Sequence, residues 1–201
     1  MPHVRLSQQP DADALLSSDP LALLVGMLLD QQVPMERAFA APRALADRLG
    51  SERLSAATIA DADPEDFVSM FSTPPALHRF PGSMAARVQA LCRAVVDSYD
   101  GDVENLWRDA PTGQELRRRL EALPGFGKQK AAIFLALLGK QFDVHPPGWR
   151  EAAGPYGDAG AMRSVADVTG PETLAAVREY KKQAKAKAKA KANAEAEAGR
   201  S

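Results

Sequence analysis

The segment "LPGFGKQKAAIF" (123–134) places one proline and two glycines within five residues, between two strongly helical patterns. Thr112, three residues before Glu115, forms the sequence pattern of a capping box and predicts the start of the first helix. A second helical pattern runs from Lys128 to about Leu138. We therefore expect two helices joined by a tight hairpin over residues 112–139.

The hairpin has the composition of an anion site. Glycine tolerates positive φ and has no Cβ, so the backbone can come close to a ligand. Free N–H groups at a helix start favour phosphate, and such contacts position a nucleic acid without reading its sequence. The residues expected to bind the DNA backbone here are Gly125, Phe126, Gly127, Lys128 and Lys130. An ordinary helix–helix connection with a glycine C-cap would look similar, so this alternative stays open.

The rest of the chain predicts an all-α protein, because alanine and leucine dominate and β-branched runs are nearly absent. The run "LALLVGMLLDQQV" (21–33) follows a possible cap at Ser18 or Asp19 and is apolar on almost every side, which predicts a helix in the centre of the core. Pro42 should break or kink the amphipathic helix that comes next.

The 201 residues suit one helical domain, expected over 1–180, and a Lys/Ala-rich tail over 181–201. Residues 178–201 hold eight Lys and Arg against three Glu, whereas the preceding 177 residues hold 17 basic and 23 acidic side chains. Basic tails often meet nucleic acid, although this one could simply aid solubility. With little to pack against, the tail should be disordered or transiently helical.

Composition also excludes several classes of site. Cys92 is the single cysteine, so internal disulfides, a cysteine zinc site and a four-cysteine iron–sulfur cluster are ruled out. The three histidines have no partners at metal-ligand spacing, so we expect neither metal nor cofactor. We see no secretory signal and no apolar run of about 20 residues, which predicts a cytoplasmic, nucleoid-associated protein without membrane contact.

The stretch "LEALPGFGKQKAAIFLALLG" (120–139) closely resembles the helix-hairpin-helix of the HhH-GPD superfamily of DNA glycosylases, typified by endonuclease III. "PLALLVGMLLDQQV" and "RFPGSMAARVQALCRAVVDSYDGDV" resemble further family segments, in family order, so the similarity covers roughly residues 20–149. The resemblance implies a two-lobed all-α fold that holds double-stranded DNA in its cleft with the target base flipped out. It also implies that Gln32 enters the duplex and that Phe80 is the apolar wedge, although Phe80 could instead fold back onto the core. His78 and Arg79 beside it could touch phosphate or be solvated loop residues.

The sequence departs from the family at two catalytic positions. Gln129 occupies the position of the lysine that forms a Schiff base in bifunctional members, and an amide cannot form an imine. The family aspartate that follows the second helix corresponds to His145 in "FDVHPPGW", with Asp143 two residues earlier. Residues two apart on an extended segment face the same side, so either Asp143 or His145 is expected to assist water attack.

These features predict a monomeric base-excision repair protein that hydrolyses the N-glycosidic bond of a damaged or modified base without cutting the strand. Trp149 and Tyr156 are expected to stack on the extruded base, or else to anchor their own loop. A catalytically inactive module of the same fold that recognises damaged DNA is the main alternative. A protein-interaction scaffold is a weaker one, because it leaves Gln32 and the basic tail unexplained.

Overall fold

The computed structural model describes residues 3–198, and the regular secondary structure in this part of the chain is all helical, without strands. This confirms the all-α prediction. In chain order the elements are α1 (Pro10–Ser18), α2 (Pro20–Leu29), α3 (Met35–Arg48), α4 (Ala56–Asp61), α5 (Pro64–Ser72), α6 (Pro81–Tyr99), η1 (Val103–Leu106), α7 (Gly113–Glu121), α8 (Lys128–Gln141), α9 (Trp149–Ala153), η2 (Gly154–Tyr156), η3 (Val165–Asp167) and α10 (Pro171–Ala198).

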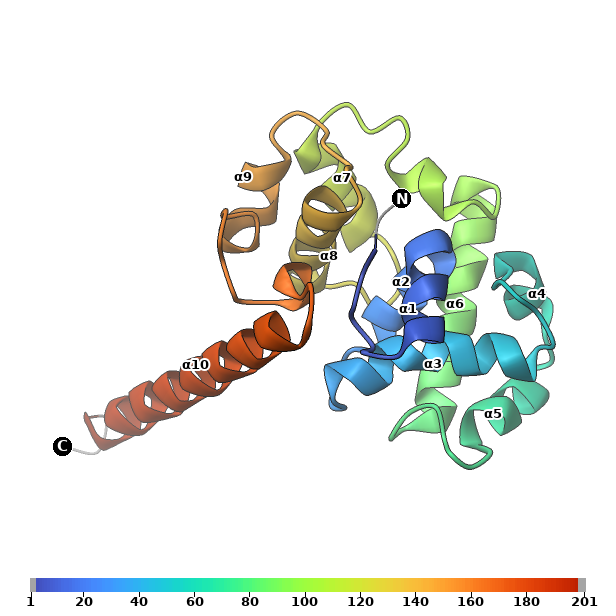
Figure 1. Cartoon of the computed structure of the whole chain (residues 1–201), viewed down its shortest axis with the longest axis horizontal. Coiled ribbons are helices and arrows are strands. Elements are labelled where there is room, and N and C mark those ends of the chain that lie inside the picture. The colour runs from blue at the N-terminus through green and yellow to red at the C-terminus, as the bar shows by residue number, and fades with distance from the viewer. Residues whose placement is uncertain (1–2, 199–201) are drawn as a thin grey trace.

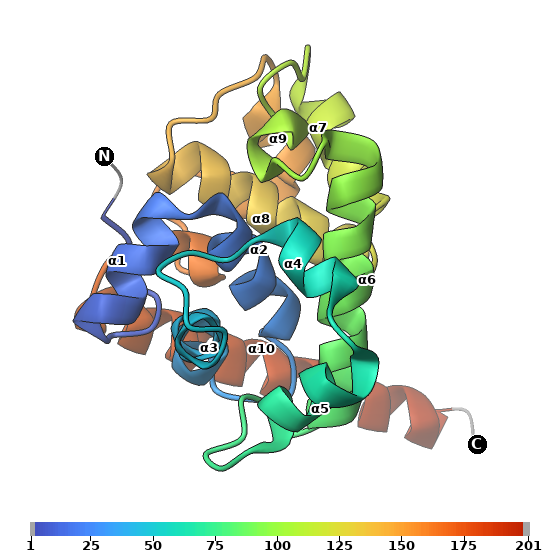
Figure 2. The ribbon, with the colours of Figure 1, turned by 90° about the vertical axis from the view of Figure 1, so that its right-hand side faces the viewer.

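The helices form two lobes on either side of α2 (Figure 1). One lobe contains α3 to α6, and the other contains the hairpin α7–α8 with α9 packed against both of its helices. The view turned by 90° shows α2 enclosed between α8, α3 and α6 (Figure 2). The hairpin and the loop before α6 therefore lie on different lobes, with the end of α2 between them.

Helix α2 is the central buried element, as its sequence predicts. Every residue from Leu21 to Leu29 is buried. The Asp19 carboxylate caps the helix by accepting from the N–H groups of Leu21 (3.0 Å) and Ala22 (3.3 Å). Its second oxygen accepts from the Leu54 N–H at 2.9 Å, which ties the start of α2 to the lobe of α3–α6. One buried carboxylate thus caps the core helix and also joins its first turn to the neighbouring lobe.

Two local expectations are corrected by the structure. Pro42 lies inside α3 without breaking it. The predicted capping box at α7 is only half formed: the Thr112 hydroxyl accepts from the Glu115 N–H at 3.1 Å. The Glu115 side chain binds Arg118 and Arg119 instead, and these hydrogen bonds lower its pKa to about 2.

Helix α10 carries the lysine-rich segment away from the body (Figures 1 and 2). It is attached through buried Leu174 and Val177 and through an ion pair between Arg178 and Glu36 of α3. All residues from 178 to 190 are exposed, in agreement with the expectation that the tail has little to pack against. The tail boundary expected after residue 180 falls within this helix, whereas residues 199–201 and the Lys191 side chain lie outside the described part.

Within residues 3–198, no single helix has both the length and the apolar composition of a membrane span. Only the sharply bent pair α1–α2 passes that test, and α2 is part of the buried core. The same residues contain no cluster of three or more His, Cys, Asp or Glu side chains that could hold a metal ion.

Candidate nucleic-acid interface

The two exposed glycines of the turn between α7 and α8 differ in what a side chain at each position would meet. Gly125 has a φ of +81°, which only glycine adopts readily, and a Cβ there would come within 2.4 Å of Leu28 Cδ1. Gly127 has an ordinary φ of −77°, and a Cβ there would meet nothing within 4 Å. Phe126 between them is buried and packs edge-on against Phe134, so its side chain anchors the turn rather than facing DNA.

The start of α8 lacks the side-chain cap that several other helices have. Asp19, Ser55, Asp63 and Thr112 cap α2, α4, α5 and α7, whereas no side chain bonds to the first N–H groups of α8 after Gly127. These N–H groups lie at the positive end of the helix dipole and remain available to an anion. Lys128 is exposed beside them.

Lys130 does not flank this position as expected but reaches back to the end of α2. Its Nζ donates to the Leu28 carbonyl at 2.7 Å, one of the free C-terminal carbonyls of that helix. Burial lowers the pKa of Lys130 to about 8, although Asp30 nearby partly opposes the shift. Lys130 therefore belongs to the space between the hairpin and the end of α2, and not to the outer face of the hairpin.

This space is an open cleft of about 570 Å³, within the range of pockets that hold small organic groups. Its walls come from the end of α2, the start of α8, η2 and α10. The lining residues are Met27, Asp30, Gln31, Gln32, Val33, Gln129, Lys130, Ile133, Pro155, Tyr156, Arg163, Tyr180, Lys181 and Ala184. Three predicted site residues from separate parts of the sequence, Gln32, Gln129 and Tyr156, are thus brought together.

The cleft side chains are held in defined positions. Gln129 Nε2 donates to the Tyr156 hydroxyl at 2.9 Å, which joins α8 to η2. Gln32 is exposed and has a φ of +57°, uncommon for a residue other than glycine. Gln31 donates to the Leu28 carbonyl at 2.8 Å and accepts from Arg87 of α6 at 3.1 Å. The end of α2 is therefore tied to both lobes.

The loop before α6 presents Phe80 to solvent, with 41% of its surface exposed, and the Arg79 guanidinium lies 5.2 Å from its ring centre. His78 is fully buried rather than a solvated or phosphate-binding residue. Its Nε2 bonds to the Gln31 carbonyl at 3.0 Å and its Nδ1 accepts from the Phe80 N–H at 3.1 Å. This pattern requires a neutral ring protonated on Nε2, and burial lowers its pKa. His78 thus links the exposed Phe80 to the cleft.

Asp143 and His145 do not line the cleft. His145 Nε2 bonds to the Gly139 carbonyl at 2.6 Å, and its ring stacks on Trp149. Gly139 lies ten residues after Gln129, which is about 15 Å along α8. The Asp143 side chain is 95% exposed and pairs with His145. The loop with two prolines therefore keeps both residues at the far end of α8.

Trp149 is a core residue and not part of a base pocket. Only 8% of its surface is exposed, and its ring packs directly on Gly139. His145 stacks on the same ring, and the Arg150 guanidinium lies 4.4 Å from its centre. Of the two aromatic residues expected at the base, only Tyr156 lines the cleft.

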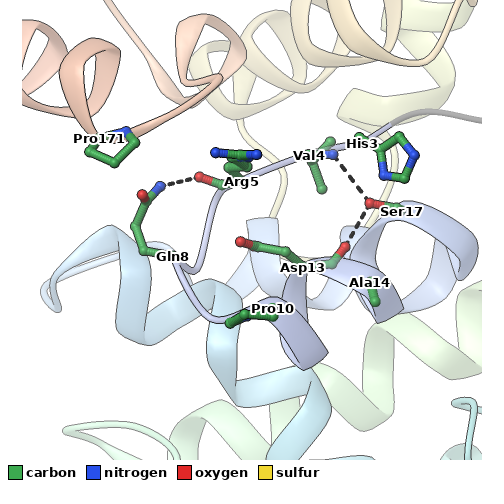
Figure 3. A pocket seen from close by; sticks show the side chains of 9 residues that line it. All are labelled: His3, Val4, Arg5, Gln8, Pro10, Asp13, Ala14, Ser17 and Pro171. Carbon is green, nitrogen blue, oxygen red and sulfur yellow. Dashed lines mark hydrogen bonds between the residues drawn. The ribbon is translucent and has the colours of Figure 1, made fainter.

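A second hollow lies between the N-terminal segment, α1 and the start of α10 (Figure 3). Several of its polar groups bind one another: the Val4 N–H donates to Ser17 Oγ at 3.2 Å, and Ser17 Oγ donates to the Asp13 carbonyl at 2.6 Å. Gln8 likewise binds the Arg5 carbonyl. This hollow contains none of the predicted site residues.

Comparison with protein families supplies the decisive observation. The model of the HhH-GPD superfamily of base excision DNA repair proteins matches residues 25–191, which include α2 from its middle, the hairpin and most of α10. The chain belongs to the HhH-GPD superfamily. No curated protein and no solved structure matches it. Membership in HhH-GPD identifies base excision repair of DNA as the activity class and DNA as the partner.

Sequence reasoning missed part of the HhH-GPD cleft. The sequence pattern places Asp30 at the end of an apolar helix, and a lone charged residue in that position is a usable signal of a site. Tyr180 and Lys181 enter the wall from α10, 50 residues after Lys130. No local pattern predicts that contact, because it depends on how α10 docks.

Proposed function

We propose that this protein binds duplex DNA through its hairpin and hydrolyses the N-glycosidic bond of a damaged or modified base without cutting the strand. The observation that supports this best is the convergence of Gln32, Gln129 and Tyr156 on one cleft. A flipped base needs such a pocket beside the duplex, with an aromatic face and amide groups for its polar edge.

The backbone amides of Gly125, Gly127 and Lys128 hold phosphate in this proposal, while Gln32 and Phe80 fill the gap left by the base. The exposed, uncapped start of α8 supports the first part. The position of Phe80 supports the second, because a wedge must stand clear of the core to enter the base stack, and Phe80 is exposed with the Arg79 guanidinium beside its ring. Hydrolysis without lyase action follows from Gln129, whose amide cannot form an imine.

Base release tests the activity directly. Purified protein is incubated with duplexes that carry uracil, oxidised, alkylated or mismatched bases, and strands are analysed before and after alkali. We expect cleavage of at least one duplex only after alkali, because hydrolysis leaves an intact abasic strand. Strand cleavage before alkali, or covalent trapping by borohydride, would contradict the hydrolytic mechanism and would direct attention to the amine of Lys130.

A DNA-binding module without catalysis is the second candidate, favoured by the placement of Asp143 and His145 outside the cleft. It predicts preferential binding of a damaged duplex with no base release from any substrate. A gel-shift comparison of damaged and undamaged duplexes, run on the same panel, distinguishes the two functions.

A further inference from the structure

One carboxylate lines the cleft, and it belongs to Asp30. Asp143 and His145, the residues that the resemblance to the family suggested, lie elsewhere. Asp30 forms the C-cap of α2, next to Gln31 and Gln32, and its side chain is the one carboxylate among the described residues that line the cleft. No hydrogen bond or ion pair to another described residue engages its oxygens. A carboxyl group in such a position is available to a ligand.

The surroundings of Asp30 raise the pKa of its carboxyl above the ordinary value. Burial raises the pKa of the carboxyl, and Glu36 of α3 adds to the shift. Lys181 of α10 and Lys130 of α8 oppose it, because their positive charges stabilise the carboxylate. The ammonium of Lys130 is held by the Leu28 carbonyl, and Glu36 is engaged by Arg178. The charges that shift the pKa of Asp30 therefore come from α10, α8 and α3, and Arg163 is a further cation in the cleft lining.

We propose that Asp30 is the general acid of the cleft and donates its proton to the base as that base leaves the sugar. This inference rests on the proposed glycosylase function. In the step, the C1′–N bond breaks and its electron pair takes the Asp30 proton on a ring nitrogen of the base. Water then forms the C1′–O bond and gives a proton to the Asp30 carboxylate, which restores the acid.

The position of Asp30 agrees with this role. It lies in the same cleft as Gln32, Gln129 and Tyr156, whereas Asp143 lies about one helix length away along α8. A group that transfers a proton must come within hydrogen-bonding distance of the reacting atom. Among the described carboxylates, Asp30 is the one that lines the cleft in which a base would bind between α2 and α8.

The first test measures single-turnover base release as a function of pH with saturating wild-type or Asp30→Asn protein. The wild-type rate should fall as pH rises and the acid deprotonates. Asp30→Asn should be slower by about 10²- to 10⁴-fold and lose that high-pH dependence. Asp97→Asn, which changes an exposed carboxylate on α6, is the matched control. Thermal unfolding and affinity for an abasic duplex should be unchanged in both variants.

A second variant tests the same proposal without altering Asp30. Lys181→Met removes a positive charge that faces the carboxyl from an exposed position, so the midpoint of the high-pH decline should move upward. Lys182→Met removes an equal charge outside the cleft lining and should keep the wild-type midpoint. This readout stays informative even where Asp30→Asn fails to fold.

The outcomes are separable. If folded Asp30→Asn releases the base at more than about a tenth of the wild-type rate, the inference is overturned and the glycosylase function stands. An unmoved midpoint in Lys181→Met would do the same. Loss of release in Asp143→Asn, with release retained in Asp30→Asn, would return the role to the loop after α8. Absence of release from every substrate by the wild-type protein would overturn both the function and the inference.

Discussion

Helix α8 has a glycine near each end, but Gly127 at its start faces open space whereas Gly139 near its end lies under the Trp149 ring. The first glycine leaves room for a ligand that is not part of the chain. The second leaves room for a side chain of the protein itself. The same residue type therefore marks a binding surface at one end of the helix and core packing at the other, and only the surrounding structure distinguishes them.

Trp149→Ala should have the largest effect, because it removes the side chain that packs on Gly139. We expect the free energy of unfolding to fall by about 3–5 kcal/mol, the usual cost of truncating a buried aromatic residue. Urea unfolding measures the loss, and Trp107→Ala, which truncates a half-buried tryptophan, should cost less. Unchanged stability combined with weaker binding of a flipped base would show that Trp149 contacts the base instead of supporting the core.

Gly127→Phe, at the other end of α8, should weaken DNA binding without lowering stability. A Cβ at this position meets no protein atom within 4 Å, so stability should be retained, whereas the ring of the new side chain should cover the free N–H groups. Losing one hydrogen bond to a charged phosphate costs about 1.5–3 kcal/mol, or roughly 10- to 100-fold in DNA affinity.

The reciprocal variant is Gly139→Ala, whose Cβ would lie 2.4 Å from the Trp149 ring. It should lower stability by about 1–3 kcal/mol through overpacking while leaving DNA affinity unchanged. Fluorescence anisotropy with a labelled duplex measures affinity, and Gly170→Phe serves as an open-site control. Equal affinity of Gly127→Phe and wild type would remove the hairpin from the interface.

Lys130→Met tests whether the amine at the cleft end of α8 is desolvated in the folded protein. The pKa of Lys130 is about 8 in the folded protein against an ordinary value of 10.5. Between these values the unfolded chain binds more protons, so this residue makes stability rise with pH from about 8 to 10.5. The variant should lack that part of the rise. Urea unfolding at several pH values compares the two proteins, and identical slopes would show that the amine is not desolvated.

Tyr156→Phe should have the smallest effect, because it removes one hydrogen bond, from Gln129, in an exposed setting. We expect a loss of at most about 1 kcal/mol in stability. Base release should persist, because the aromatic face remains. A double-mutant cycle with Gln129→Ala measures the coupling between the two residues, and a coupling well above this value would mean that the bond organises the whole cleft.

The sequence predicted the parts of this molecule that local rules control. The Asp19 cap, the fully buried helix α2 and the paired helices around Gly125 follow from patterns within a few residues of each other. These features also carried the resemblance to the family whose model the chain matches.

Features that depend on packing between distant segments were predicted less well. Lys130 was expected beside the phosphate site, but its direction is set by the Leu28 carbonyl, about 100 residues earlier in the chain. Trp149 and His145 follow the prolines of the loop toward Gly139, and sequence alone does not give the path of a loop. Asp30 belongs to the cleft only because α8 and α10 close around the end of α2.

The shape of α10 has a consequence for the size of the DNA site. A helix of 28 residues is about 42 Å long, comparable to about a dozen base pairs of a duplex. Tyr180, Lys181 and Ala184 of α10 line the cleft. Beyond them the helix extends away from the body to one side only (Figure 1). A nuclease footprint centred on the damaged base should therefore be asymmetric, and the longer arm of protection would report which way the protein faces along the strand.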